Sequence, residues 1–439
     1  MDRINYAQDI VKPLNMVTGP NGEVQISGFI HKIRVMSGFS FVILRVNGSL
    51  VQCVMNESMG QELQDHVIEG NTVSIEGQLR KEERAPHGFE IEIHALHVLS
   101  KSAEHPPIVI NRKNMSLSLD TNLNYRSISL RHPKEAAIFK IQEGIVRGFR
   151  DFLHKNHFTE VRTPKIVFAG AEGGANIFKL NYFEQEVFLA QSPQFYKQAL
   201  VGVYDRVFEV GPVYRAEKHN TSRHLNEYTS LDFEMGYIHD FTDIMKMEVG
   251  FLKYMFELLK EEYADQIKLL DVDIPHVDSI PALKFLEVKK IIEEKYQRIP
   301  TDYDDLDPEE EQLICDYVKQ EYGSEFVFVT HFPSDKRPFY AQDDPNSPQF
   351  TLSFDLLFRG LEVTTGGQRI HDYHDQIYKM RQKGMNVDDF ESYLMSHKYG
   401  IPPHGGLGAG LERLTMKLLK LPNIRQACFY PRDMNRVTP

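Results

Sequence analysis

The segment YRAEKHNTSRHLNEYTSLDFEMGY, residues 214–237, places cationic side chains beside carboxylates and an aromatic ring. Arg215 and Arg223 stand in its first half, and in its second half apolar and polar residues alternate, which is the period of a half-buried strand. The polar face of that strand carries Asp232 and Glu234. The combination suits a ligand with phosphates, a flat ring and an amino group. The alternative is an exposed hairpin whose ion pairs contribute little to stability.

A second segment, LSFDLLFRGLEVTTGGQRIHDYHD, residues 352–375, contains hard oxygen ligands. Asp355 and Glu362 lie on either side of a predicted turn, where they could hold Mg²⁺ that also contacts phosphate oxygens. Arg369 follows two glycines, so a ligand can approach the backbone closely there. The two histidines that follow have the spacing of a zinc pair but lack a third ligand, and we interpret them as structural.

A third segment, PPHGGLGAGLERLTMKLLKL, residues 402–421, predicts a glycine-rich strand that runs into a helix. The glycines would let a ring lie on the strand, and Arg413 with the helix N-terminus would bind phosphate. The spacing is not that of a dinucleotide fingerprint, and no phosphate-binding loop of the GxxxxGK[ST] type occurs in the chain.

The elements that must position these segments predict an α+β fold. Residues 22–100 read as short strands separated by turns, with Asn47-Gly48 as a hairpin signal, and both OB-fold and SH3-like barrels fit them. A proline-containing linker and a long amphipathic helix follow. Further strands cluster around 186–237 and 326–371, and about 240–325 reads as a mostly helical excursion. Because strands and helices do not alternate regularly, we expect an antiparallel sheet in this part.

The bulk composition excludes some classes of protein. With a net charge of −12 the chain is not a generic polyanion binder, so any nucleic-acid contact must rest on local geometry. Its three cysteines form neither a metal-binding spacing nor a disulfide framework. Neither a signal segment nor a run of membrane-spanning length is present in the sequence, which predicts a cytoplasmic protein without membrane contact.

The three segments resemble motif 2, the strand before motif 3 and motif 3 of the class II aminoacyl-tRNA synthetases. The finer resemblance is to the aspartyl-tRNA synthetases of the archaeal/eukaryotic type (class IIb), carried also by AQSPQFYKQ, GGQRIHDY and FYPRD. It spans nearly the whole chain. It implies an N-terminal OB-fold barrel that binds the anticodon at 1–102, a hinge at 103–130, and a class II catalytic domain, an antiparallel sheet flanked by helices, at 131–439. The helix and strand over 136–166 resemble motif 1, which implies a homodimer.

The resemblance also implies a role for each motif residue. Arg215 and Arg413 would be the catalytic residues, gripping the α- and γ-phosphates of ATP. The residues implied to bind ATP are Arg215, Glu217, Arg223, His224, Tyr228, Glu362 and Arg413. Those implied to bind L-aspartate are Glu172, Ser192, Gln194, Lys197, Asp232, Thr365 and Arg369. Asp355 and Glu362 would ligate Mg²⁺, and the residues implied to contact anticodon bases are Phe41, Gln52 and Glu90.

The implied activity is that of an aspartate–tRNA ligase, which forms aspartyl-adenylate from ATP and transfers aspartate to the 3′ end of tRNA(Asp). Some members of the family also charge tRNA(Asn), and His31 lies in a region that tunes the third anticodon base, but this one residue leaves the tRNA range open. Alternatives are an asparaginyl-tRNA synthetase, a relative that makes asparagine through an adenylate, and a non-catalytic paralogue. Lys197 speaks against the first, the barrel against the second, and the two phosphate-gripping arginines against the third.

The chain departs from the family pattern mildly in the catalytic segments and more clearly in the hinge. Tyr228 stands where Phe is usual and Thr365 where Ser is common. In the hinge, Asn122, Asn124 and Ser129 replace acidic and basic residues. These changes put the contacts of the hinge in doubt and leave the catalytic reading intact.

Overall fold

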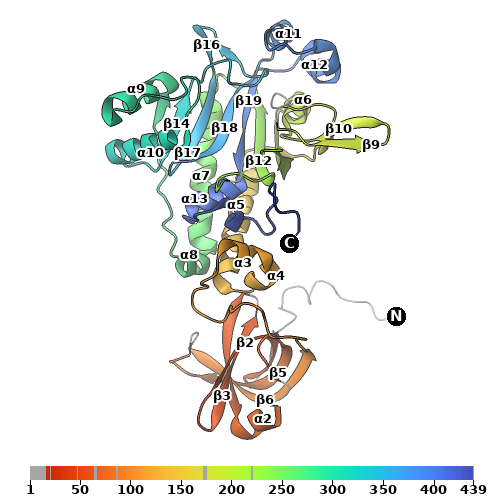
Figure 1. The fold of residues 1–439 in the computed structure, drawn as a ribbon, viewed down its shortest axis with the longest axis vertical. Coiled ribbons are helices and arrows are strands. Elements are labelled where there is room, and N and C mark those ends of the chain that lie inside the picture. The colour runs from red at the N-terminus through yellow and green to blue at the C-terminus, as the bar shows by residue number, and fades with distance from the viewer. Residues whose placement is uncertain are drawn as a thin grey trace. The chain divides into compact units, whose positions relative to one another are not determined.

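The computed structural model describes residues 16–19, 21–46, 48–63, 67–85, 88–171, 176–218 and 221–438. The chain forms two compact units that divide between Ala137 and Ile138 (Figure 1). Within the described ranges, no helix is both long enough and apolar enough to cross a membrane.

The first unit is a closed five-stranded barrel, as predicted. The strands run in the order β2-β3-β4-β6-β5, and β5 pairs with β2 to close the barrel. A short strand β1 adds to β2, and helix α2 follows β4. The bounds are β1 Met16–Thr18, β2 Glu23–Val35, β3 Phe39–Val46, β4 Ser49–Asn56, α2 Glu57–Leu63, β5 Thr72–Lys81 and β6 Phe89–Ser100.

Strand β3 shows how the sequence sets the two faces of the barrel. Val42 and Leu44 are fully buried in the barrel core, whereas Phe41 and Arg45, at the alternate positions, are only partly buried. Gly48, with a φ of +81°, makes the turn into β4. Asn47, the other residue of the predicted hairpin signal, lies outside the described residues.

The hinge forms two short helices around a buried arginine. The helices are α3 (Leu119–Asn124) and α4 (Arg126–Ser129). Arg126 is 1% exposed, and its Nη1 donates to Asn122 Oδ1 and to Glu135 Oε2, each at 2.9 Å. Ser129 Oγ donates to the same Asn122 oxygen at 2.7 Å. Two of the hinge residues that depart from the family pattern, Asn122 and Ser129, therefore complete a buried hydrogen-bond network with Arg126.

The second unit is built on an eight-stranded sheet in the order β13-β14-β17-β18-β19-β12-β11-β7. The six central strands pair antiparallel, as predicted, whereas the outermost pairs, β13–β14 and β11–β7, are parallel. The bounds are β7 Thr159–Glu160, β11 Arg206–Tyr214, β12 Glu227–Gly236, β13 Ala282–Lys284, β14 Phe326–Thr330, β17 Ser353–Phe358, β18 Glu362–Gln368 and β19 His404–Gly410.

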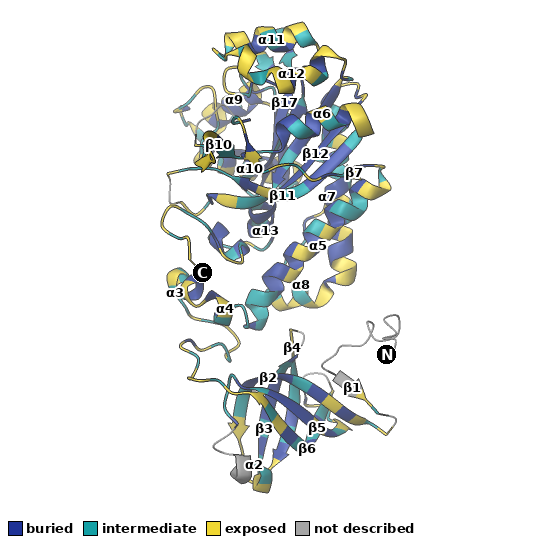
Figure 2. Ribbon diagram, turned by 90° about the vertical axis from the view of Figure 1, so that its right-hand side faces the viewer, coloured by how far each residue is buried: buried dark blue, intermediate teal, exposed yellow. Residues whose placement is uncertain are grey.

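One face of this sheet is covered by two long helices, α5 (Pro133–Lys155) and α7 (Thr242–Glu262). Phe149 of α5 and Phe251 of α7 meet edge to face at 5.1 Å and join Phe233 of β12 in the main core. The central strands are accordingly buried along most of their length (Figure 2). The helices pack closely because α5 has Gly148 where a Cβ would lie 3.0 Å from Met255 of α7.

Smaller elements surround the sheet. Helices α9 and α10 pack beside β14 on a separate apolar cluster. Asp307 caps α10, accepting from the backbone N–H groups of Glu309 and Glu310. The acidic residues Glu309, Glu310 and Glu311 form the first turn of this helix. The remaining bounds are β8 Ile166–Val167, β9 Lys179–Tyr182, β10 Gln185–Leu189, α6 Gln194–Tyr204, α8 Ala264–Leu270, α9 Phe285–Tyr296, α10 Pro308–Tyr322, β15 Asp343–Asp344, β16 Ser347–Thr351, α11 Tyr373–Gln382, α12 Glu391–Lys398 and α13 Leu411–Leu418.

Candidate active site

A cavity of about 820 Å³ lies in the second unit, on the polar side of β12, β18 and β19. Its size is that of a site for a nucleotide-sized ligand. Glu172 lies outside the described residues. The other residues predicted for catalysis, ATP, aspartate and metal all line this one cavity: Ser192, Gln194, Lys197, Arg215, Glu217, Arg223, His224, Tyr228, Asp232, Asp355, Glu362, Thr365, Arg369 and Arg413.

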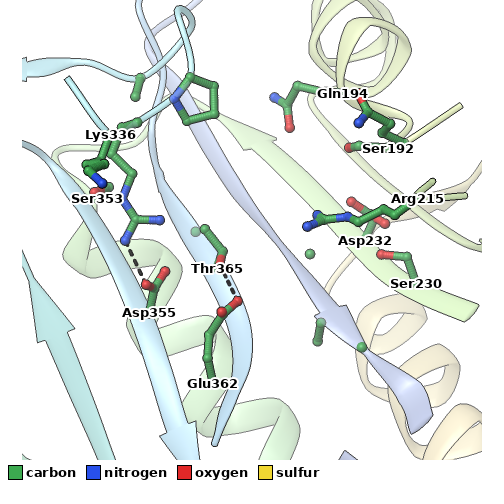
Figure 3. Close-up of a pocket in the computed structure, with 18 of the residues that line it drawn as sticks. Ser192, Gln194, Arg215, Ser230, Asp232, Lys336, Ser353, Asp355, Glu362 and Thr365 are labelled. Atoms are coloured by element: carbon green, nitrogen blue, oxygen red, sulfur yellow. Dashed lines mark hydrogen bonds and ion pairs between the residues drawn. The ribbon is translucent and has the colours of Figure 1, made fainter. Parts of the chain in front are cut away.

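The predicted grouping follows from the pleat of the sheet. Alternate residues of β12 face the cavity, and Tyr228, Ser230 and Asp232 all line it. The register places Asp232 of β12 opposite Gly408 of β19, and Gly408 opposite Thr365 of β18. Figure 3 shows Asp355 and Glu362 on neighbouring strands at one side of the cavity, with Ser192 and Gln194 at the other.

At one end of the cavity, two buried cations meet two buried carboxylates. Lys197 of α6 is 2% exposed, and its Nζ donates to Asp232 Oδ1 and to the Leu407 carbonyl, each at 2.9 Å. Arg369 donates through Nε to Glu234 Oε1 at 2.9 Å. Glu234 Oε2 lies 3.3 Å from Lys197 Nζ, so this one carboxylate contacts both cations.

Glu234 is a residue that the sequence prediction placed on the right face but did not assign to the site. Its side chain is fully buried. Burial raises the pKa of a carboxyl, but Arg369 and Lys197 outweigh burial here and hold the pKa of Glu234 below its usual value. Glu234 is therefore ionised. The signal that could have found it is the period-two spacing from Asp232.

A buried polar network lies behind these charges. Gln198, the residue after Lys197 on α6, contacts His404 Nε2 at 2.9 Å and accepts from the Tyr393 hydroxyl at 3.3 Å. Tyr393 also donates to Gln376 Oε1 at 3.2 Å. Burial above all lowers the pKa of His404 to about 4, so its ring is neutral. The network fixes α6, and with it Lys197, against α11, α12 and β19.

The two predicted metal ligands lie together at the other end. Arg337 donates to Asp355 Oδ2 at 2.7 Å, while Asp355 Oδ1 is buried and has no hydrogen-bonding partner among the described residues. Thr365 Oγ1 donates to Glu362 Oε1 at 2.8 Å. Burial raises the pKa of Asp355 to about 6, with Arg337 opposing that shift and Glu362 adding to it.

This donor set fits a Mg²⁺ ion. Mg²⁺ is commonly held by one or two carboxylates together with substrate phosphates. The buried Oδ1 of Asp355, which has no hydrogen-bonding partner among the described residues, could be one such ligand, and Glu362 could supply another. No group of three or more His, Cys, Asp or Glu residues that could hold a metal occurs in the described ranges. A cation here would therefore take its remaining ligands from phosphate oxygens and water.

The arginines predicted to bind phosphates come from two parts of the chain, because Arg215 and Arg223 both lie in the connection between β11 and β12. Arg413 lies at the start of α13, 3.4 Å from Glu362 Oε2. The Arg215 guanidinium lies 6.0 Å from the centre of the Tyr228 ring, at the limit of a cation–π contact. Arg223 forms an ion pair with Glu311 of α10, a buried carboxyl whose pKa burial raises to about 7 in spite of Arg223.

Arg337 and Glu311 were not predicted as part of the site. Both come from outside the three motif segments; Arg337 lines the cavity, and Glu311 contacts Arg223, which lines it. Each also neutralises a residue that was predicted, since Arg337 pairs with Asp355 and Glu311 with Arg223. No sequence signal in their own segments marks either residue.

The residues predicted to contact the anticodon lie together on the outside of the barrel. Gln52 of β4 donates through Nε2 to Glu90 Oε2 of β6 at 2.9 Å. Phe41 of β3 packs edge to face against Phe39, with ring centres 5.1 Å apart. The three side chains are partly buried. An aromatic ring and an amide–carboxylate pair on one barrel face can stack on bases and read their edges.

Comparison with known families agrees with this architecture. The family described as tRNA synthetases class II (D, K and N) matches residues 118–434, and the OB-fold nucleic acid binding domain matches residues 24–99. The chain belongs to this class II tRNA synthetase family, and it is a ligase, as the sequence predicted.

Individual relatives narrow the group. The chain is 44% identical to the aspartate–tRNA(Asp/Asn) ligase of Thermus thermophilus over 95% of this chain and 97% of the relative. It is 35% identical to the aspartate–tRNA(Asp) ligase of Pyrococcus abyssi over the full length of both. Among solved structures, the asparaginyl-tRNA synthetase from Pyrococcus horikoshii complexed with asparaginyl-adenylate matches with a TM-score of 0.87 and 31% identity, covering 95% of this chain and 96% of that one.

Proposed function

We propose that the chain is an aspartate–tRNA ligase, which activates L-aspartate with ATP and transfers it to the 3′ end of tRNA(Asp). The observation that carries the proposal is the buried pair of cations, Lys197 and Arg369, at one end of the nucleotide-sized cavity. The relatives with 35% and 44% identity, both aspartate ligases, support it.

The charges around Lys197 and Arg369 account for the choice of aspartate. Asp232 and Glu234 balance Lys197 and Arg369 in formal charge and hold the two cations in place, so an aspartate side-chain carboxylate would meet two positioned hydrogen-bond donors. Lys197 and Arg369 would grip that carboxylate, and Asp232 would bind the α-ammonium group. Asparagine lacks the negative charge, and each charged hydrogen bond that it fails to make costs about 1.5–3 kcal/mol.

The reaction needs no nucleophilic side chain from the protein. The aspartate α-carboxylate attacks the α-phosphorus of ATP and pyrophosphate leaves. A hydroxyl of the terminal tRNA adenosine then attacks the carbonyl of the adenylate, and AMP leaves. Arg215 and Arg413 would stabilise the charge on the phosphates, with Arg223 and His224 at the outer phosphates. Tyr228 would stack on adenine, and Glu217 would help hold it. Positioning and charge stabilisation supply the acceleration.

Asp355 and Glu362 would hold Mg²⁺, which neutralises charge on the phosphates when bound. Ser192, Gln194 and Thr365 would complete the aspartate site together with Glu172. In the first unit, Phe41, Gln52 and Glu90 would contact anticodon bases. We also propose that residues 1–102 act as the anticodon domain, 103–130 as the hinge and 131–439 as the catalytic domain. We propose further that α5 and β7 form a homodimer interface and that the protein is cytoplasmic.

We further propose that tRNA(Asn) is a second substrate. The relative at 44% identity is an aspartate–tRNA(Asp/Asn) ligase, whereas the relative at 35% identity is an aspartate–tRNA(Asp) ligase. His31, which the resemblance connects with the third anticodon base, is 8% exposed and lies in β2 of the barrel. Charging of purified tRNA(Asp) and tRNA(Asn) transcripts with aspartate tests this directly, and charging of tRNA(Asp) alone would contradict it.

The experiment that tests the main proposal is ATP–pyrophosphate exchange without tRNA, run with aspartate, with asparagine and with no amino acid. Exchange with aspartate alone is the expected result. Exchange with asparagine would favour the alternative that the chain is an asparaginyl-tRNA synthetase, like the solved structure it resembles. A complete lack of exchange, with charging also absent when tRNA is added, would favour a non-catalytic paralogue.

A further inference from the structure

A second, smaller cavity of about 140 Å³ lies within the first unit, between the outer face of the barrel and the hinge. Strands β2 and β3 form one wall, and hinge residues between 105 and 111, together with Arg131 just after the hinge, form the other. Its volume is that of a few water-sized groups of about 30 Å³ each, which is room for a phosphate group but not for a nucleoside triphosphate.

Two guanidinium groups share one aromatic ring in this cavity. The Arg45 Cζ lies 4.6 Å and the Arg131 Cζ 5.1 Å from the centre of the Phe29 ring, and all three residues are partly buried. An arginine held against a ring by its planar group keeps its N–H edges available as donors. In the described part of the chain, neither guanidinium forms an ion pair or a hydrogen bond with a carboxylate.

Neither guanidinium is therefore paired with a carboxylate of the described residues. Burial, and next the positive charge of Arg131, lower the pKa of Arg45, and no acidic group opposes them. Glu69 also lines the cavity, but its two oxygens accept from the Ile33 backbone N–H and from Asn111 Nδ2 and from neither arginine. Partly buried like charges that are not directly paired are costly, so an anion that contacted both guanidinium groups would be bound favourably.

A third group in the cavity lacks a partner. His31 is 8% exposed, and its Nδ1 has no hydrogen-bonding partner among the described residues. Burial, with smaller contributions from nearby cations, lowers the pKa of His31 to about 4, so the ring is neutral and Nδ1 can carry a proton to donate. A buried, unpartnered donor beside two uncompensated arginines is the donor set of a phosphate site.

We propose that Arg45, Arg131 and His31 bind one phosphodiester of the tRNA backbone. The site lies on the face that carries Phe41, because Phe41 and Arg45 are alternate residues of β3, four positions or roughly 13 Å apart along the strand. An RNA strand whose bases reach Phe41 therefore runs within reach of Arg45, and of Arg131, which packs on the same Phe29 ring. This inference rests on the proposed function, since it takes tRNA as the ligand.

Phosphate-alkylation interference on a tRNA(Asp) transcript tests the proposal, using the full-length protein and the variants Arg45→Gln and Arg131→Gln. In both variants, alkylation of the same one or two neighbouring phosphates should no longer weaken binding. The slope of log K against log salt should become less steep by about 0.7–0.9 for each phosphate that is no longer bound. Lys290→Gln is the matched control, because it removes one exposed positive charge from α9 in the other unit and should leave the interference pattern unchanged.

Two results would overturn the proposal: an unchanged interference pattern in both variants, or changes confined to unrelated phosphates. Melting curves and the conservative variant Arg45→Lys, which should recover part of the binding, separate weaker phosphate binding from unfolding of the barrel. The tRNA pattern is independent of aspartate activation. Failure of aspartate-dependent exchange in the unmodified protein would therefore count against the proposed function and leave the phosphate site to its own test.

Discussion

Replacing Glu234 with glutamine should disable the amino-acid end of the site although the shape of the side chain barely changes. Glu234 Oε1 accepts from Arg369 Nε at 2.9 Å, and Oε2 lies 3.3 Å from Lys197 Nζ and 3.4 Å from Arg369 Nη2. A glutamine offers one acceptor and one amide donor, so one of the two cations would face a donor. The formal charge of the four-residue cluster would also change from zero to +1 among buried side chains.

Two magnitudes follow from this geometry. Removing one member of a buried ion pair costs about 3–5 kcal/mol of folding free energy, because the partner charge stays buried. Misplacing one charged donor costs about 1.5–3 kcal/mol of substrate binding, which corresponds to roughly a 10–100-fold loss in kcat/KM for aspartate. We expect Glu234→Gln to show both effects in urea unfolding and in ATP–pyrophosphate exchange.

Glu248 of α7 provides a matched control. It is also buried, at 1% exposure, but burial above all raises the pKa of its carboxyl to about 8, so near pH 7 it is already neutral. Glu248→Gln should therefore cost less than about 1.5 kcal/mol and leave exchange unchanged. Equal effects of Glu234→Gln and Glu248→Gln, or normal aspartate exchange in Glu234→Gln, would refute the reasoning.

Three further predictions concern the phosphate end, the sheet and pH. Arg413→Ala should abolish exchange with circular dichroism unchanged, whereas Phe41→Ala should spare exchange and weaken tRNA charging by about 1–3 kcal/mol of missing stacking energy; swapped effects would contradict the domain assignment. Gly406→Ala should strongly lower the urea midpoint, since its Cβ would clash with the Phe233 carbonyl and the Glu234 carboxylate, while Gly202→Ala, where a Cβ meets nothing within 4 Å, should not. Folded Glu248 keeps its proton to about pH 8 but loses it near pH 4.5 when unfolded, so between these values stability should fall with rising pH more steeply than in Glu248→Gln; parallel curves would contradict this.

Much of the fold could be predicted because its signals are local. The alternation in residues 228–236 predicts β12, and the Asp307-Pro308 pair predicts the start of α10. The parallel pairing of β7 with β11 at one edge of the sheet and of β13 with β14 at the other could not be predicted, because the paired strands are far apart in sequence. The hinge network around Arg126 was also missed, because Asn122 and Ser129 form their hydrogen bonds only once the chain has folded and that arginine is buried.

The candidate site divides in the same way. Residues in the three motif segments were found because the resemblance places them one by one, and the strand period places Glu234 beside Asp232. Arg337 and Glu311 were missed because they compensate charges that other segments bring to the cavity. Compensation of this kind is a property of the folded arrangement, and a loop or helix that supplies it carries no pattern of its own.

The pairing of cations in the cavity has a consequence for turnover. Arg223, Arg413, Lys197 and Arg369 each already contact a carboxylate of the protein. A substrate must therefore compete with internal anions, and a small ion that reaches only one of these cations, such as free sulfate or phosphate, gains little from the exchange. The same carboxylates return to the arginines when pyrophosphate departs, so the protein competes with its own product. Pairing within the protein in this way favours release of the charged product from an active site that binds highly charged substrates.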